Sequence, residues 1–134
     1  MKCILKVSPP VSGDELNALF SSVWPNHQKT DFRPILDHAL VYVCAFEGER
    51  LVGFTKVVGD GGIHGFLLDP TVAPDRQRNG IGQQMAELCA DEARRKGVEW
   101  LHVDYEPRLK DFYDSCGFSP SAAGLRNLNK ERPN

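Results

Sequence analysis

Residues 63–97 read IHGFLLDPTVAPDRQRNGIGQQMAELCADEARRKG, and the change of pattern within this stretch decides the expected fold. Ile63–Ala73 predicts a strand, but Pro70 within it has no N–H to donate to a sheet ladder. We therefore expect a bulge, or the end of strand pairing, at Pro70. Over Gly80–Lys96 the apolar residues recur at helical spacing, and Gly97 is a typical helix stop. The stretch thus predicts a strand that opens locally, a glycine loop and a long helix.

Further strands and helices are expected on both sides of this stretch. Glu99–Tyr105 predicts a strand after the helix, and a right-handed crossover would place it parallel to Ile63–Ala73. Upstream, Val41–Phe46 and Leu51–Val58 are rich in β-branched and aromatic residues and predict an antiparallel hairpin. Ser12 and Glu15 form a capping box that predicts the start of another helix. The remaining expected elements are a short strand, a second short helix, a helix near the C-terminus and a final strand: Cys3–Val7, Phe32–Leu40, Pro107–Gly117 and Phe118–Leu128.

The composition fits one globular domain, which we expect to span residues 1–134. The longest nearly unbroken apolar stretch, Ala39–Phe46, is too short to cross a bilayer. A formal net charge of -2 gives no general electrostatic case for binding nucleic acid or anionic lipid. The four cysteines stand far apart and lack metal-ligand spacing, so neither a zinc site nor a disulfide framework is predicted. We expect a cytoplasmic protein with no metal, no membrane contact and no nucleic-acid partner.

Residues 72–82, VAPDRQRNGIG, are the part of the sequence that can hold an anion. Gly80 and Gly82 stand where the helix begins, so backbone N–H groups without an intrahelical partner point outward and can cradle a phosphate. Arg76 and Arg78 add local positive charge. For an arbitrary G-x-G, turn geometry alone is the commoner reason for the glycines. Residues after Gly82 complete neither a dinucleotide fingerprint, which needs a third small residue, nor a P-loop, which needs Lys and then Ser or Thr.

Two short motifs, QRNGIG at residues 77–82 and FYDSCGF at residues 112–118, together resemble the GNAT superfamily of acyl-CoA-dependent N-acetyltransferases. The first matches that family's (Arg or Gln)-x-x-Gly-x-(Gly or Ala) motif, with Val72 and Pro74 in their usual upstream places. The second matches its F-Y-x-x-x-G-F segment. The two motifs at this separation are more specific than either alone, and the resemblance covers roughly residues 41–128.

The resemblance implies an α/β (α+β) fold, with a mixed, largely antiparallel sheet, splayed parallel central strands and about four flanking helices. The pantetheine arm of acetyl-CoA would fill the splay, and Pro70 lies near it. The asparagine that many members carry before the tyrosine helix is absent, although Arg108 and Lys110 are placed to meet the cofactor phosphates. The implied cofactor-binding residues are Val72 and Ala73 for the pantetheine, and for the phosphates Gln77, Arg78, Asn79, Gly80, Ile81, Gly82, Gln83 and Lys110.

Acetyl transfer to an amine needs a neutral nucleophile and a proton for the departing thiolate. Tyr113 matches the family tyrosine and would donate that proton, since a phenol is protonated at neutral pH. Its place on an apolar helix face also fits a core tyrosine. For the base we choose Asp69, with Glu106 and Asp104 as rivals, while solvated strand-end carboxylates are the alternative for all three. Asp69 and Val72 share a face of the sheet only if the bulge shifts the register.

We expect an N-acetyltransferase that passes the acetyl group of acetyl-CoA to a primary amine of a small molecule or peptide by direct attack in a ternary complex. The alternative is a non-catalytic acyl-CoA-binding or sensory module of the same fold. Trp24 and Phe32 would shape the acceptor pocket or else pack in the core. His64 would lean into the acceptor site or else lie at the surface. The resemblance also suggests a homodimer, because short chains of this family often form dimers.

Overall fold

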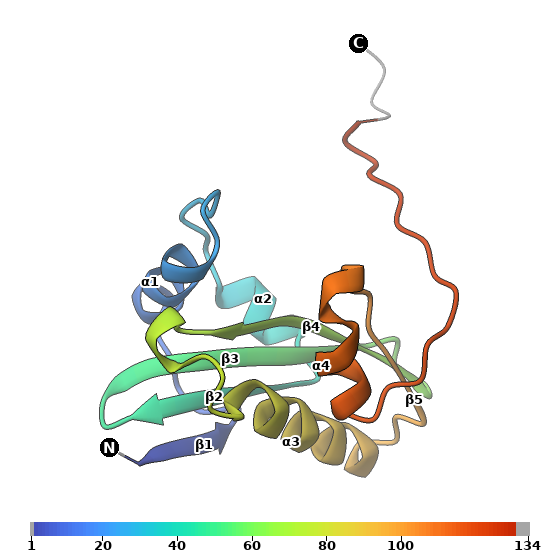
Figure 1. Cartoon of the computed structure of the whole chain (residues 1–134), viewed down its shortest axis with the longest axis horizontal. Helices are drawn as coiled ribbons and strands as arrows, with labels where there is room; N and C mark the ends of the chain where they lie inside the picture. Colours follow the sequence, from blue (N-terminus) through green and yellow to red (C-terminus); the bar gives the residue numbers. More distant parts are fainter. Residues whose placement is uncertain (1, 131–134) are drawn as a thin grey trace. The chain divides into compact units, whose positions relative to one another are not determined.

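The computed structural model describes residues 2–130, and the chain divides into two compact units, Met1–Val103 and Asp104–Asn134. The first unit holds a five-stranded sheet in the order β1-β2-β3-β4-β5 (Figure 1). Neighbouring strands from β1 to β4 are antiparallel, and β5 is parallel to β4. The strands are β1 (Cys3–Val7), β2 (Val41–Glu47), β3 (Arg50–Gly59), β4 (His64–Val72) and β5 (Trp100–His102). The helices are α1 (Gly13–Val23), α2 (Arg33–His38), α3 (Ile81–Arg95) and, in the second unit, α4 (Lys110–Ser115).

The mixed sheet, its parallel β4–β5 pair and the four helices of residues 2–130 confirm the expected fold class. The capping box is also confirmed, because the Ser12 hydroxyl accepts a hydrogen bond from the Glu15 N–H, and the Glu15 carboxylate accepts one from the Ser12 N–H. This cap sets the start of α1, whose apolar face packs on β3 and β4. The buried face of α1 consists of Leu16, Leu19 and Phe20.

Helices cover both faces of the sheet in the first unit. Phe54 on β3 points toward α1, and its ring centroid lies 5.9 Å from that of Phe20. Side chains alternate along a strand, so its neighbour Gly53 faces the other way, toward α3. A Cβ atom built on Gly53 would lie only 2.9 Å from the sulfur of Met85. In Figure 1, α1 and α2 lie on one side of the sheet and α3 on the other.

The bulge expected at Pro70 is confirmed by the pairing of β3 with β4. Lys56 is opposite Leu68 and Phe54 is opposite Thr71, so two residues of β4, at positions 69 and 70, face one residue of β3. This irregularity lies directly before the glycine loop, as the sequence predicts.

The final strand expected at Phe118–Leu128 is wrong. Residues 118–127 form neither helix nor strand, and a turn follows at residues 128–130. Pro120 cannot donate a ladder hydrogen bond, and the segment lacks the alternation of apolar residues that would bury one face of a strand. Leu125, one of its few large apolar residues, is 82% exposed. The strand expected at Glu99–Tyr105 is present but shorter, as β5.

Across residues 2–130, no helix combines the length and the apolar character that spanning a membrane requires. The expected single domain, residues 1–134, stays a proposal, because the chain divides into two compact units.

Candidate active site

The parallel strand β5 pairs with only the first part of β4. Their pairing is confined to three positions and ends where Phe66 is opposite His102. Strand β4 continues for six residues beyond Phe66, to Val72, and these residues have no partner on β5. Over these six residues β5 leaves one edge of β4 unpaired, and the bulge lies within this stretch.

The backbone of Val72 points toward this open edge. The N–H of the next residue, Ala73, donates to the carbonyl of Val52 on β3 at 2.8 Å. Successive backbone groups of an antiparallel strand point to opposite sides, so the N–H of Val72 points away from β3. The sequence assigned both residues to the pantetheine. Ala73 has both backbone polar atoms engaged in the protein, because its carbonyl accepts from the N–H of Arg76 at 2.9 Å.

The loop between β4 and α3 presents further backbone amides. A short 3-10 helix, η1 (Pro74–Arg76), opens the loop, and Gly80 caps α3 in the left-handed region at φ 78°. Arg78 also has a positive φ, 67°, which is costly for a residue with a side chain. The first N–H groups of a helix have no intrahelical partner, so the start of α3 at Ile81 and Gly82 suits an anion.

Two side chains of the loop stabilise its shape rather than point outward. The carboxamide of Gln77 donates to the carbonyl of Val72 at 3.0 Å, and the carboxamide of Asn79 donates to the carbonyl of Arg76 at 3.2 Å. Both residues belong to the predicted cofactor set, and in this arrangement their side chains bind protein backbone.

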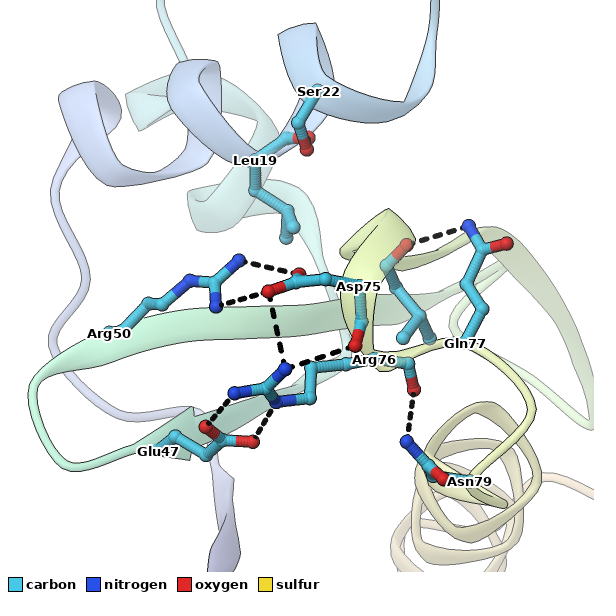
Figure 2. A network of polar contacts seen from close by, with 9 residues as sticks. Leu19, Ser22, Glu47, Arg50, Asp75, Arg76, Gln77 and Asn79 are labelled. Atoms are coloured by element: carbon cyan, nitrogen blue, oxygen red, sulfur yellow. Dashed lines mark hydrogen bonds and ion pairs between the residues drawn. The ribbon is translucent and has the colours of Figure 1, made fainter. Parts of the chain in front are cut away.

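Arg76, expected from the sequence to add positive charge for a phosphate, binds carboxylates of the protein instead. Its guanidinium donates to both oxygens of Glu47 and to the carboxylate of Asp75 (Figure 2). Arg50 donates to both oxygens of Asp75 at 2.8 and 2.9 Å. Hydrogen bonds from Arg76 lower the pKa of Glu47, and hydrogen bonds from Arg50 lower that of Asp75. Arg78 forms no ion pair within residues 2–130 and is exposed, so it is the loop cation left for a ligand.

Asp69, the predicted base, lies in the bulge with φ 54°. Its carboxylate contacts the ammonium group of Lys56 at 2.7 Å, and the exposed fractions of the two side chains are 49% and 10%. Lys56 shares a face of β3 with Phe54, whereas Val72 is opposite Gly53 on the other face. The bulge shifts the register, because Leu68 and Thr71 lie opposite Lys56 and Phe54 on one face of β3. Asp69 and Val72 still do not share a face: the contact with Lys56 places the Asp69 carboxylate on the α1 face, while the side chain of Val72 lies on the α3 face.

Trp24 and Phe32 differ in their surroundings. The indole N–H of Trp24 donates to the hydroxyl of Thr71 at 3.4 Å, close to the bulge, and Trp24 is 42% exposed. Phe32 is buried and packs against Phe20, with ring centroids 5.2 Å apart. Of the two aromatic residues proposed for the acceptor pocket, Trp24 is the one that a ligand can reach.

The second unit contains the predicted site residues Tyr113, Glu106 and Lys110. The ring of Tyr113 stacks on that of Tyr105 at 4.6 Å and also contacts the rings of Phe112 and Phe118. The carboxylate of Glu106 is paired with exposed Arg108 at 2.7 Å. The ammonium group of Lys110 lies 2.6 Å from the carboxylate of Asp114, which raises its pKa. Glu106 and Lys110 are thus each paired with an opposite charge within a few residues of Tyr113.

Several residues of the first unit were missed by the sequence reasoning. Glu47 and Arg50 flank the turn of the β2–β3 hairpin, and no local spacing connects them with a loop about 25 residues later. Lys56 lies on a strand that reads as ordinary core. His64 was expected at the surface or in the acceptor site. A ring nitrogen of His64 lies 2.9 Å from a ring nitrogen of His102, and this contact connects β4 with β5.

Comparison with known proteins gives a consistent result. Residues 13–118 match the sequence model of a family described as "Acetyltransferase (GNAT) family". The chain is 30% identical over 118 residues to serotonin N-acetyltransferase 2, chloroplastic, of Oryza sativa subsp. japonica, covering 84% of this chain and 59% of the relative. It is 29% identical over 118 residues to GCN5-related N-acetyltransferase 1, chloroplastic, of Arabidopsis thaliana, covering 86% and 60%. The chain thus spans about three fifths of the length of these relatives.

Solved structures share the fold. A GNAT-family acetyltransferase from Streptococcus pneumoniae superposes with a TM-score of 0.76 at 24% identity, covering 94% of this chain and 98% of the other. An aminoglycoside N-acetyltransferase in complex with CoA superposes with a TM-score of 0.76 at 15% identity, covering 94% and 93%. At these identities the likeness supports the fold alone.

Proposed function

The chain belongs to the acetyltransferase (GNAT) family, and from this premise we propose that it transfers the acetyl group of acetyl-CoA to a primary amine of a small molecule or peptide. One observation carries the proposal: the edge of β4 that β5 leaves unpaired beyond Phe66 contains a bulge and leads directly into a loop whose helix is capped by a left-handed glycine, Gly80. An extended pantetheine chain fits an unpaired strand edge, and a diphosphate fits uncapped helix amides.

The cofactor contacts we propose follow this path. The N–H of Val72 would bind the pantetheine, and Ala73 would contribute packing because its polar backbone atoms are occupied. The amides of residues 78–83 would bind the pyrophosphate, with Arg78 supplying positive charge. Gln77 and Asn79 would act through the loop shape that they stabilise, and Lys110 would meet a phosphate only by leaving Asp114.

For the chemistry we propose that Tyr113 protonates the departing thiolate, because a phenol keeps its proton at neutral pH. Asp69 is the carboxylate we propose as the base, with Glu106 as its rival. Direct transfer in a ternary complex requires that residues of both units serve one reaction, so we propose that residues 1–134 work as a single domain. A homodimer is also proposed, on the family resemblance alone.

The acceptor class is open to direct test. The names of related proteins include serotonin N-acetyltransferase and aminoglycoside N-acetyltransferase, and we propose arylalkylamines and aminoglycosides as the first acceptors to try. The two plant relatives described above are named as chloroplastic, so a plastid is the alternative to the proposed cytoplasmic location.

The experiment is a thiol-release assay with acetyl-CoA and a panel containing serotonin, an aminoglycoside, a polyamine, an amino acid and a short peptide. The proposed enzyme releases free CoA with at least one amine. A binding module of the same fold would instead show CoA-dependent thermal stabilisation and no thiol with any of them. With the amine found, Tyr113→Phe is expected to lower kcat about tenfold or more without matching loss of CoA affinity. Unchanged turnover removes Tyr113 from the mechanism.

A further inference from the structure

Four charged side chains connect the β2–β3 hairpin with the glycine loop. Glu47 and Arg50 belong to the hairpin, on either side of its two-residue turn, and Asp75 and Arg76 belong to the 3-10 helix of the loop. We call these four residues the loop brace. In Figure 2 dashed lines connect Glu47 to Arg76, Arg76 to Asp75 and Asp75 to Arg50, so the four side chains form one continuous network.

Every nitrogen of the Arg76 guanidinium has a protein partner in this arrangement. Its Nε and Nη2 atoms donate to the two oxygens of Glu47, and its Nη1 atom donates to the carbonyl and carboxylate of Asp75. All three guanidinium nitrogens therefore bind protein oxygens. The Glu47 side chain is 10% exposed and that of Arg76 is 33% exposed, so solvent screens this pair less than an open surface pair.

The brace acts on the backbone that precedes the helix. Asp75 is fixed from the hairpin by two hydrogen bonds of Arg50, and the carbonyl of Arg76 accepts from the carboxamide of Asn79. The N–H of Arg76 is used as well, in the hydrogen bond to Ala73 that closes the 3-10 turn. Between these fixed points the chain passes through the positive φ of Arg78, which needs surrounding contacts to persist.

We propose that Glu47 and Arg76 are positioning residues for the phosphate-binding amides of residues 78–82, and that Arg76 is not itself a phosphate ligand. This inference rests on the proposed function for its ligand, a CoA diphosphate. The hairpin, which is distant in sequence from the glycine motif, sets the conformation in which the loop amides meet that ligand. Arg78 is then the loop arginine that faces the diphosphate.

The two possible roles of Arg76 predict opposite effects of Glu47→Gln. If Arg76 is a phosphate ligand restrained by Glu47, the variant frees it, and CoA binds as tightly as before or more tightly. If Glu47 and Arg76 position the loop, Glu47→Gln and Arg76→Gln both weaken CoA binding, each by about tenfold, and the double variant is no worse than either. Binding is measured by calorimetry with CoA. In the acetyl-transfer assay KM for acetyl-CoA rises by the same factor while kcat stays within about twofold.

Glu92→Gln is the matched control. Glu92 is a partly exposed glutamate of α3 paired with Arg95 near the far end of the helix, so its substitution makes the same chemical change away from the loop. CoA affinity is expected to remain at the wild-type value.

A ligand-free measurement separates this inference from the proposed function. Amide hydrogen exchange of residues 74–82 is compared between the wild-type protein and Glu47→Gln without CoA, and the inference predicts faster exchange in the variant. Unchanged exchange overturns it, as does CoA binding by Glu47→Gln that equals or exceeds that of the wild type. A wild-type protein that binds no CoA contradicts the proposed function, and the exchange experiment still decides whether the hairpin holds the loop.

Discussion

The glycine loop and the β4 bulge use their charged side chains in opposite ways. In the loop the accessible partner of a pair is the cation, because Arg76 is 33% exposed and its partner Glu47 only 10%. In the bulge the accessible partner is the anion, because Asp69 is 49% exposed and its partner Lys56 only 10%. Each region has a nearly buried charge on another strand, Glu47 on β2 or Lys56 on β3, and a more exposed opposite charge on β4 or the loop that follows it.

The difference lies in how many bonds the open partner makes. Arg76 uses all three of its nitrogens within the protein, so the positive charge left for a ligand is that of Arg78. The carboxylate of Asp69 uses one oxygen on Lys56 and retains a large exposed surface. A side chain whose charged atoms all have protein partners positions its segment. A side chain with one partner and a large exposed fraction can still contact a substrate.

Asp69→Asn tests the second half of this comparison and carries the largest expected effect. If the carboxylate accepts the amine proton, kcat/KM falls about 100-fold at neutral pH, and the acid limb of its pH profile disappears. The measurement is the pH dependence of kcat/KM with the amine found by the panel assay. Asp91→Asn, which alters an exposed carboxylate paired with Arg94, is the control and should behave as the wild type.

Lys56→Met separates the role of the carboxylate from that of the ion pair. This variant removes the buried partner and leaves Asp69 charged, so a catalytic Asp69 still gives an acid limb. If Asp69→Asn keeps the wild-type acid limb, Asp69 is only the counter-ion of Lys56. The exposed charge of the bulge would then serve the protein structure, as Arg76 does in the loop.

Gly80→Ala tests how strictly the loop conformation is required. A side chain at φ 78° costs about 1–2 kcal/mol, because the left-handed region brings Cβ too close to the backbone. We expect the loop to shift away from this conformation and CoA affinity to fall about tenfold. Calorimetry with CoA measures the effect. Gly13→Ala is the control, since Gly13 has open space around it and no positive φ; equal affinities for Gly80→Ala and the wild type would show that the loop tolerates another shape.

Local sequence signals were sufficient for most of the fold. The capping box of Ser12 and Glu15, the proline of the bulge and the two glycines around α3 each act within a few residues, and each is found where the sequence predicts it. Phe118–Leu128 failed because a strand was expected there without the alternation that a half-buried strand shows. The expectation that a strand occupies a given place in a fold is therefore weaker evidence than the pattern of apolar and polar residues in the segment itself.

The sequence located the candidate site only where the expected binding depends on backbone conformation. Glycine and proline change the backbone at their own positions, so the loop and the bulge could be located from the sequence. The partners of Arg76 and Asp69 lie on other strands, and their choice depends on sheet register, which no local spacing reveals. Of the two arginines expected to add positive charge to the loop, Arg76 is paired with protein carboxylates, and the role of Arg78 toward a phosphate stays a prediction.

Acid should weaken the loop brace over a defined range. The pKa of Glu47 lies below its usual value of 4.5 and that of Asp75 below 3.8, so both carboxylates bind fewer protons in the folded than in the unfolded protein. Their stabilisation is complete above these usual values and is lost as the pH falls through the lowered ones. From pH 6 to pH 3 we expect the protection of loop amides to fall about fivefold in the wild type. In the Glu47→Gln, Asp75→Asn double variant it should change little; the same acid sensitivity in both proteins would assign the effect elsewhere.

The outer pair of the brace should have the smallest effect. Arg50 and Asp75 are 50% and 55% exposed, and ion pairs this open change an equilibrium constant by only a few fold. Arg50→Gln is expected to lower CoA affinity about twofold, measured by calorimetry beside Arg76→Gln. Arg50→Lys should not restore it fully, because an ammonium group cannot reproduce the two parallel hydrogen bonds of the guanidinium. A loss as large as that of Arg76→Gln would mean that the hairpin positions the loop through Asp75, and that the nearly buried contact with Glu47 is secondary.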